Sequence, residues 1–269
     1  MPANSALVVE DDRFLRVVGI VLDPATSRER TAAYADFFAH DEPDFAGYCL
    51  RVRTRVGELF PREVRLVETQ DELRAALPGS CALVVESLRV GREELVAGGA
   101  LRIVHKFGLK PRNIDTAACA DRGIKVLTLR RRANIACAEL AIALMLTLAK
   151  KLHRLAGRIS VDDLCAIGYA YKPFDRRHTP NSNWARISGL HTLNGATLGI
   201  IGLGEIGREI AIRAAAFGMR ILYYQRTRLP AAEEHELHAT YVPLETLLAQ
   251  GDWVVPQLPG GPATRAFIL

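Results

Sequence analysis

The chain has 269 residues, with 35 Lys and Arg against 30 Asp and Glu, and 49% of its residues are hydrophobic. This composition excludes a disordered, collagen-like or coiled-coil protein, and the length suits one large or two medium domains. The pI near 9.1 could suggest nucleic acid. However, the basic residues are dispersed, and the one tight run, at 130–132, has no aromatic neighbours. We therefore expect no nucleic-acid partner.

The cysteines and the apolar stretches bear on the compartment. Five cysteines, an odd count without a C-x-x-C pair, favour a reducing, cytoplasmic location. No signal peptide is visible at the N-terminus. The longest apolar stretch, 136–149, contains Glu139 and is shorter than the roughly 20 residues that a membrane span requires. We therefore expect no membrane association.

The first half of the chain alternates between β-rich runs and helical patterns. Strands are predicted at 14–22, 63–67, 81–85, 101–105 and 124–129. Helices are predicted at 27–40, 44–59, 70–77, 92–97 and 112–122, the last with Gly123 at its C-cap. Thr69 and Glu72 form a capping-box pattern at the start of the third helix. This alternation indicates a parallel sheet with helices on both faces.

The second half begins with a long helix, predicted at 134–155 from apolar residues at helical spacing. The irregular segment 157–195 is too long for a simple connection, so we expect it to serve function or oligomerisation. A second α/β unit starts at Ala196. Its strands are predicted at 197–201, 219–224, 241–242 and 253–255, and its helices at 205–217 and 244–250. The fold class is therefore α/β, with two successive α/β units.

One motif carries a specific chemistry. Gly202-Leu203-Gly204-Glu205-Ile206-Gly207 has the pattern G-x-G-x-x-G between a predicted strand and a predicted helix, which is the context of a dinucleotide-binding site. The first glycine permits the tight turn, the second lets the backbone approach the pyrophosphate, and the third lets the helix pack closely on the strand. The helix N-terminus would bind the diphosphate.

The residues after the next strand bear on the choice of cofactor. An Asp or Glu about 20 residues after the glycines normally binds the ribose 2′-hydroxyl of NAD. This chain instead has Gln225, Arg226, Thr227 and Arg228. A neutral amide with two guanidinium groups and a hydroxyl would attract a 2′-phosphate, so we predict that NADP(H) is favoured over NAD(H). The alternative is that both arginines are solvated and Gln225 binds a plain ribose.

A longer series of motifs surrounds the glycines. It comprises Asn113-Ile114-Asp115, Arg122-Gly123-Ile124-Lys125-Val126, Ala138-Glu139, Leu193-Asn194-Gly195-Ala196-Thr197-Leu198-Gly199-Ile200-Ile201, Phe217-Gly218-Met219, Asp252-Trp253-Val254-Val255, Leu258-Pro259 and Thr264-Arg265. In this order the series resembles the D-isomer-specific 2-hydroxyacid dehydrogenases, a family that includes formate, phosphoglycerate and glyoxylate/hydroxypyruvate dehydrogenases. The resemblance runs from about Leu83 to the end of the chain.

The resemblance implies a domain organisation. Residues 1–132 would form a flavodoxin-like substrate-binding domain, and residues 133–269 an NAD(P)-binding Rossmann domain. The helix at 134–155 would connect the domains, and the segment 157–195 resembles a dimerisation arm, which implies a homodimer. The resemblance thus implies an α/β fold with two Rossmann-like domains that contain parallel sheets, and the active site of the family lies between them.

The resemblance also implies site residues. Backbone amides at Lys106, Phe107, Gly108 and Leu109 would hold the carboxylate of a small anionic 2-oxo or 2-hydroxy acid. Gln257, Leu258 and Pro259 would approach the nicotinamide side of the cofactor, and Thr264 would also contribute to cofactor binding. The cationic pair Lys110 and Arg112 would suit an anionic or phosphorylated substrate, or would simply face water. No metal site is expected.

No catalytic residue can be assigned. The family's Arg, Glu and His follow the Thr264-Arg265 region, and none of the seven histidines matches; His105, at a strand end, is a weak substitute acid. Only four of six Rossmann strands are predicted, so we expect a second domain truncated after its fourth strand. The predicted function is a D-2-hydroxyacid dehydrogenase that transfers a hydride to or from NAD(P)(H). The alternative is a non-catalytic dinucleotide-binding regulatory or corepressor-like protein, or an inactive fragment.

Overall fold

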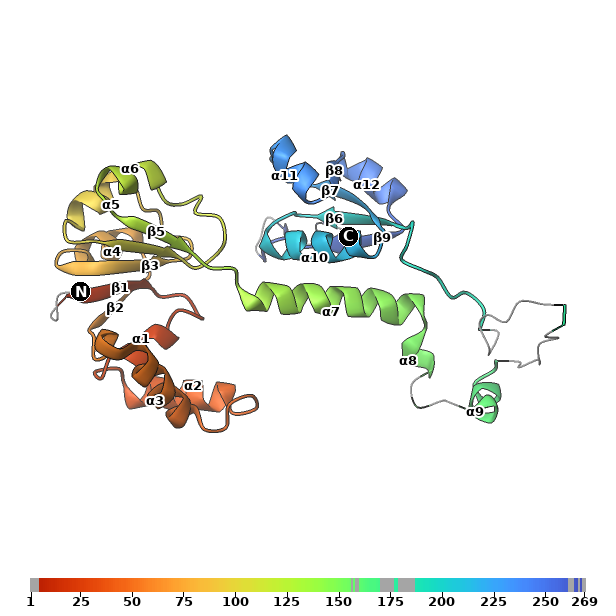
Figure 1. Ribbon diagram of the computed structural model, residues 1–269, viewed down its shortest axis with the longest axis horizontal. Helices are drawn as coiled ribbons and strands as arrows, with labels where there is room; N and C mark the ends of the chain where they lie inside the picture. Colours follow the sequence, from red (N-terminus) through yellow and green to blue (C-terminus); the bar gives the residue numbers. More distant parts are fainter. Residues whose placement is uncertain are drawn as a thin grey trace. The chain divides into compact units, whose positions relative to one another are not determined.

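The computed structural model describes residues 5–155, 157, 160–169, 177–178, 187–260, 264–265 and 267. The chain divides into two compact units, Met1–Arg131 and Arg132–Leu269. Each unit contains one parallel sheet with helices packed against it (Figure 1). The prediction of an α/β fold with two parallel sheets is therefore confirmed.

The sheet of unit 1 has five parallel strands in the order β2-β1-β3-β4-β5. They are β1 (Ala6–Glu10), β2 (Val64–Val67), β3 (Ser80–Val85), β4 (Ile103–Lys106) and β5 (Lys125–Thr128). This is one of the doubly wound orders, that of flavodoxin. The central strands β1 and β3 are buried on both faces, which explains why their sequences are continuous apolar runs.

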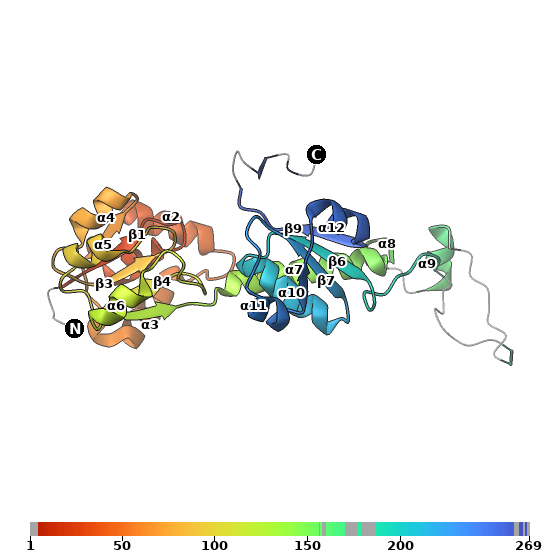
Figure 2. The same cartoon turned by 90° about the horizontal axis from the view of Figure 1, so that it is seen from above.

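Helices cover both faces of this sheet (Figures 1 and 2). One face carries α1 (Val17–Leu22), α2 (Arg28–Phe38) and α3 (Phe45–Val56), with a short 3-10 turn, Gly57–Leu59, after α3. The other face carries α4 (Gln70–Ala76), α5 (Arg92–Ala97) and α6 (Thr116–Asp121). The capping box at Thr69 and Glu72 is present as predicted.

Two predictions for unit 1 are wrong. The predicted strand at 14–22 is instead a turn followed by α1, whose Ile20, Val21 and Leu22 pack on the sheet. The first strand is β1, which the sequence reading missed. Tertiary packing has overridden the β propensity of the valines here. Helix α6 begins four residues later than predicted because the Asp115 side chain accepts the Ala118 N–H at 2.9 Å and caps it there.

The sheet of unit 2 has four parallel strands among the described residues, in the order β8-β7-β6-β9. They are β6 (Thr197–Ile201), β7 (Arg220–Tyr224), β8 (Ala239–Tyr241) and β9 (Trp253–Pro256). This corresponds to strands 3-2-1-4 of a dinucleotide-binding sheet. Helices α7 (Arg132–Ala149) and α10 (Glu205–Ala216) pack against one face, and α12 (Leu244–Gln250) packs against the other. The connection before β8 contains a helix that was not predicted, α11 (Ala231–Glu236).

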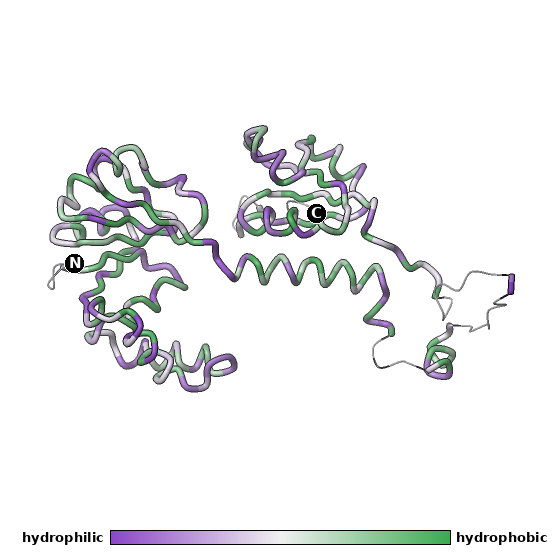
Figure 3. Tube along the Cα trace, in the orientation of Figure 1, coloured by the Kyte–Doolittle hydropathy of each residue, from purple (hydrophilic) through white to green (hydrophobic). Residues whose placement is uncertain are grey.

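The long predicted helix at 134–155 is interrupted. Helix α7 ends at Ala149, Lys151 has a φ of 53°, and a separate helix, α8 (Leu152–Leu155), follows. Helix α7 is apolar enough to cross a membrane by length and composition, and it is largely hydrophobic in Figure 3. Its Ile142 and Met145 nevertheless pack in the core of unit 2, whereas Leu144 on another side is exposed.

The arm-like segment 157–195 lies partly outside the described residues. Its described part contains α9 (Val161–Ala166), a short helix with a capping box between Ser160 and Asp163. The prolines and asparagines of the predicted irregular segment, Pro173, Pro180, Asn181 and Asn183, lie outside the described residues. Of the last four residues, 266–269, the structure describes only Phe267.

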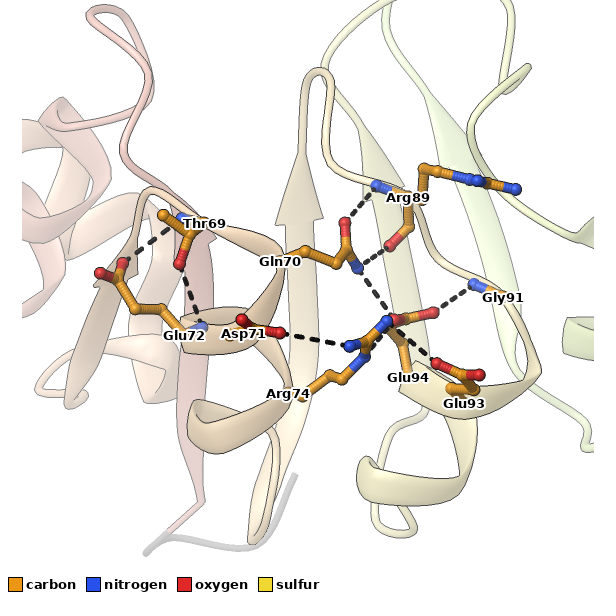
Figure 4. Close-up of polar contacts among 9 residues, drawn as sticks. All are labelled: Thr69, Gln70, Asp71, Glu72, Arg74, Arg89, Gly91, Glu93 and Glu94. Carbon is orange, nitrogen blue, oxygen red and sulfur yellow. Dashed lines mark hydrogen bonds and ion pairs between the residues drawn. The ribbon is translucent and has the colours of Figure 1, made fainter.

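A polar cluster joins α4 to α5 in unit 1 (Figure 4). The buried Glu94 carboxylate accepts hydrogen bonds from the Gly91 N–H at 2.8 Å, from Gln70 Nε2 at 2.9 Å and from Arg74 Nε at 2.9 Å. Burial by itself raises the pKa of Glu94, but these hydrogen bonds outweigh it and hold the pKa below its ordinary value. The ionised Glu94 side chain therefore holds α4 and α5 together.

Replacing Glu94 with glutamine is expected to destabilise unit 1 by about 2 kcal/mol at neutral pH, because charge-assisted hydrogen bonds become neutral ones. Glu94 has a depressed folded-state pKa, so its contribution is present above the unfolded pKa and is lost as the pH falls through the folded value. Urea unfolding at neutral and acidic pH measures the difference. The control is Glu93→Gln, which removes an exposed carboxylate on the same Arg74. An equal loss in both variants would contradict this account.

Candidate dinucleotide-binding site

The three glycines of the motif form a tight turn between β6 and α10. Gly202 has a φ of +94°, and a Cβ there would lie 2.5 Å from the carbonyl oxygen of Gln257. A Cβ at Gly207 would lie 2.5 Å from the carbonyl oxygen of Gly202. Both positions therefore exclude any side chain. A Cβ at Gly204, in contrast, would meet no atom within 4 Å.

Gly204 is the N-cap residue of α10, and no side chain caps this end of the helix. The first N–H groups of a helix have no acceptor within the helix, and they carry the positive end of its dipole. Open space beside Gly204 thus adjoins a helix end that favours an anion. The residues of the turn fit the diphosphate of a dinucleotide.

Glu205 and Leu203 support this turn from within the unit. The Glu205 carboxylate, in the first turn of α10, accepts a hydrogen bond at 2.6 Å from the Asn134 side chain in α7. Leu203 is only 1% exposed and packs in the hydrophobic core, and Ile206 packs against the same core. The side chains of Leu203 and Ile206 therefore hold the turn in place, so only their backbones remain for a cofactor.

The structure brings the ends of three strands together at this turn. The Gly202 N–H donates to the carbonyl of Tyr224 at the end of β7, at 2.8 Å. The Gln257 N–H, just after β9, donates to the carbonyl of Ile201 at 2.7 Å. The predicted residues Gln257 and Leu258 therefore lie beside the glycine turn. Pro259 follows them, and its carbonyl accepts the hydroxyl of Thr264 at 2.5 Å.

The loop after β7 contains the residues predicted to select the cofactor. Gln225 donates its amide to the carbonyl of Thr227 at 2.6 Å and closes the loop. Arg226 and Thr227 are exposed. Within the described part of the chain, Arg226 forms no ion pair. Arg226 is therefore a cation at the end of β7 that has no counter-ion among the described residues.

Arg228 differs from Arg226 because it is already paired. Its Nε and Nη2 each lie 2.8 Å from an oxygen of Glu234 in α11, and its guanidinium lies 5.7 Å from the ring centre of Tyr241. The same carboxylate accepts the hydroxyl of the buried Tyr223 at 2.6 Å. Hydrogen bonds from Arg228 and Tyr223 lower the pKa of Glu234 to about 2. The sequence alone does not distinguish the two arginines, and it does not point to Glu234.

Tyr223 is held between the loop and α11. Its hydroxyl accepts the Leu229 N–H at 2.9 Å and donates to Glu234. Burial, and then the hydrogen bond to Glu234, raise its pKa to about 12. Replacing Tyr223 with phenylalanine is expected to destabilise unit 2 by about 1–2 kcal/mol, because the Leu229 N–H loses its acceptor. Thermal unfolding at neutral pH measures this loss.

The raised pKa of Tyr223 also predicts a loss of stability in alkali. An unfolded tyrosine ionises near pH 10, so the stability from Tyr223 is complete below this pH and declines as the pH rises towards about 12. The Phe variant should lack this part of the decline. Tyr48→Phe, at an exposed position in unit 1, is the control. A Tyr223→Phe variant with the wild-type alkaline profile would be incompatible with this explanation.

The predicted substrate loop lies at the carboxyl end of β4 in unit 1. Its backbone amides are partly used within the unit: the Phe107 N–H donates to Val85 O at 2.8 Å, and the Gly108 N–H donates to Lys106 O at 3.0 Å. The Lys106 ammonium donates to the carbonyl of Glu86. Leu109 is exposed. The loop is therefore present at the predicted strand end, and the Phe107 and Gly108 amides are already paired within the unit.

A buried carboxylate next to this loop was not predicted. Glu10, at the end of β1, is 7% exposed and accepts the backbone N–H groups of Glu86, Ser87 and Leu88 at 2.6–3.0 Å. It also accepts the Ser87 hydroxyl at 2.5 Å. The loop after β3 is thereby fixed to the end of β1. Glu10 is the last residue of the apolar strand β1. This position is the one feature of the sequence that could have indicated its role.

The remaining candidate residues are His105, the cysteines and possible metal ligands. His105 lies within β4 between Val84 and Leu127, and burial lowers its pKa, so it is a neutral strand residue. Cys137 is an exposed free cysteine. Among the described residues, no group of three His, Cys, Asp or Glu side chains could hold a metal ion.

The segment that contains this glycine turn matches a known protein family. Residues 167–269 match the family described as D-isomer specific 2-hydroxyacid dehydrogenase, NAD binding domain. The chain is 35% identical over 200 residues to a glyoxylate reductase of Thermococcus gammatolerans and 34% identical over 202 residues to a hydroxypyruvate reductase of Thermotoga maritima. Residues 167–269 therefore correspond to the NAD-binding domain of this family. A D-3-phosphoglycerate dehydrogenase of Mycobacterium tuberculosis is 32% identical over 210 residues.

The matched segment, residues 167–269, includes every residue predicted to bind the cofactor. The matches to the two reductases cover 74% of this chain, and the match to the phosphoglycerate dehydrogenase covers 77%. They cover 54%, 58% and 36% of those proteins. The chain therefore spans little more than half the length of the reductases it matches.

Proposed function

We propose that this chain binds a nicotinamide dinucleotide at the β6–α10 turn and forms the cofactor half of a D-2-hydroxyacid dehydrogenase. The observation that carries this proposal is the contrast among the three glycines. Protein atoms leave no room for a Cβ at Gly202 or Gly207, whereas the space beside Gly204 is open and adjoins an uncapped helix end. A small residue next to open space is what a closely approaching phosphate requires.

Each part of the turn has a role in this proposal. The amides at the start of α10 hold the diphosphate, and Gly204 lets the backbone approach it. Gln257, Leu258 and Pro259 border the nicotinamide side, and Gln225 is placed for the adenosine ribose. The bound cofactor would supply or accept a hydride at the carbon next to the substrate carboxylate.

We also propose that the chain prefers NADP(H) to NAD(H). Arg226 and Arg228 contribute unequally to this preference. Gln225, and not an acidic residue, follows β7, and Arg226 is an exposed cation next to the Thr227 hydroxyl. Arg228 contributes less than the sequence suggested because Glu234 neutralises it. Arg226 is therefore the main candidate for the 2′-phosphate.

The proposed substrate is a small anionic 2-oxo or 2-hydroxy acid. The named relatives support this class, since they are glyoxylate and hydroxypyruvate reductases and a D-3-phosphoglycerate dehydrogenase. Lys110 and Arg112 add positive charge after the loop Lys106, Phe107, Gly108 and Leu109. A carboxylate bound there by the Gly108 N–H would have to displace the carbonyl of Lys106.

The activity is tested by following oxidation of NADPH with glyoxylate and with hydroxypyruvate, in parallel with cofactor binding. Saturable binding with turnover supports the dehydrogenase. Saturable binding without turnover favours the second candidate, a non-catalytic dinucleotide-binding protein of regulatory or corepressor type. Absence of binding would refute both.

We also propose that the chain forms a homodimer through the segment 157–195. The support is the position of this segment between α7 and β6 and its resemblance to the dimerisation arm of the family. Comparing the mass in solution of the intact chain and of a variant lacking this arm tests the proposal. A dimer of unchanged stability without the arm would contradict it.

A further inference from the structure

Glu234 is the feature of the cofactor loop that the proposed function leaves unexplained. It lies six residues after Arg228, on α11, and binds both Nε and Nη2 of that arginine at 2.8 Å. The Glu234 side chain is 11% exposed, whereas that of Arg228 is 63% exposed. The guanidinium therefore faces solvent at the end of β7 while a fixed, sheltered carboxylate cancels its charge.

We propose that Glu234 is a selectivity-determining residue that weakens the binding of NADP(H) by competing with the 2′-phosphate for Arg228. This inference rests on the proposed function, because it requires a dinucleotide with its adenosine ribose at the end of β7. It makes the two arginines unequal: Arg226 attracts the phosphate at full charge, whereas Arg228 does so only as part of a neutral pair.

The physical basis is the geometry of the pair. A bidentate guanidinium–carboxylate contact uses the two parallel N–H groups that would otherwise bind a phosphate in the same way. The carboxylate also repels a phosphate dianion placed nearby, and this repulsion acts at short range in a partly buried setting. NAD(H) has a hydroxyl at the same position, so its binding is largely independent of Glu234.

Glu234 is fixed in place by a second contact. The buried Tyr223 donates its hydroxyl to the same carboxylate, and the neighbouring Glu233 is paired with Arg208 of α10. The carboxylate therefore cannot swing away when a phosphate arrives without breaking the Tyr223 hydrogen bond. A glutamine at this position keeps an oxygen for Tyr223 and removes the charge.

The test measures the dissociation constants of NADPH and NADH for Glu234→Gln by titration calorimetry. We expect NADPH to bind about fivefold to tenfold more tightly than to the wild-type chain, from the removal of one nearby charge. The affinity for NADH should stay within about twofold, since one neutral contact changes little. In Glu234→Gln with Arg228→Ala, the gain for NADPH should disappear.

The matched control is Glu236→Gln, an exposed residue of the same helix with the same change in net charge. It should leave the ratio of the two affinities unchanged. An unaltered ratio in Glu234→Gln, or an equal gain in Glu236→Gln, would overturn the inference while leaving the proposed function intact. If neither cofactor bound to the wild-type chain or the variants, the proposed function and the inference would both fail.

Discussion

Replacing Gly204 with alanine is expected to abolish detectable dinucleotide binding while unit 2 remains folded. Gly204 has a φ of −75°, which alanine adopts without strain, and a Cβ there meets no protein atom within 4 Å. The methyl group would instead occupy the space that the diphosphate needs. We expect the affinity to fall at least about 100-fold, as for a loss of roughly 3 kcal/mol. Calorimetric titration and thermal unfolding of the same preparation measure both effects.

The matched control is Gly207→Ala. There the Cβ would lie 2.5 Å from the backbone oxygen of Gly202 and 3.3 Å from Ile200, so the strand or the helix must move. This variant should lose about 1–3 kcal/mol of stability, as an overpacked site does. If Gly204→Ala unfolded as readily as Gly207→Ala, or bound the cofactor normally, the assigned role of Gly204 would be wrong.

Replacing Arg226 with glutamine is expected to lower the affinity for NADPH about tenfold and to leave the affinity for NADH nearly unchanged. Arg226 has no ion pair among the described residues, so its full charge is available to a 2′-phosphate. A tenfold change corresponds to about 1.4 kcal/mol, within the range of a charge-assisted hydrogen bond at a partly exposed site. Parallel titrations with the two nucleotides give the ratio.

Arg220→Gln, at the amino end of β7 within unit 2, makes the same change in net charge at the opposite end of the strand from the cofactor loop. It should alter neither affinity by more than about twofold, because exposed charges farther apart than a Debye length are largely screened. If Arg226→Gln lowered the affinities for NADPH and NADH equally, Arg226 would support the loop and would not recognise the 2′-phosphate.

Local patterns predicted the parts of the structure that depend on neighbouring residues. The glycine turn, the capping box at Thr69 and the alternation of strands and helices all follow from short-range rules. The strand β1 was missed because its position at the centre of a sheet depends on pairing with β2 and β3, which lie far along the chain. The helix α1 was misassigned for the same reason.

The polar contacts that refine the site could not be predicted. Glu10 binds amides that lie 76 to 78 residues away, and Arg74 binds Glu94 twenty residues away. Glu234 is close to Arg228 in sequence, but the helix α11 that presents it was itself not predicted. Arg226 and Arg228 therefore look alike in the sequence but differ in the structure, because Glu234 neutralises the charge of Arg228.

The central claim is that the β6–α10 turn binds a nicotinamide dinucleotide, and calorimetric titration of the unmodified chain with NADPH and NADH tests it most directly. We expect both nucleotides to bind saturably at a single site per chain, with NADPH bound more tightly. Binding that does not saturate at millimolar concentrations of either nucleotide would contradict it.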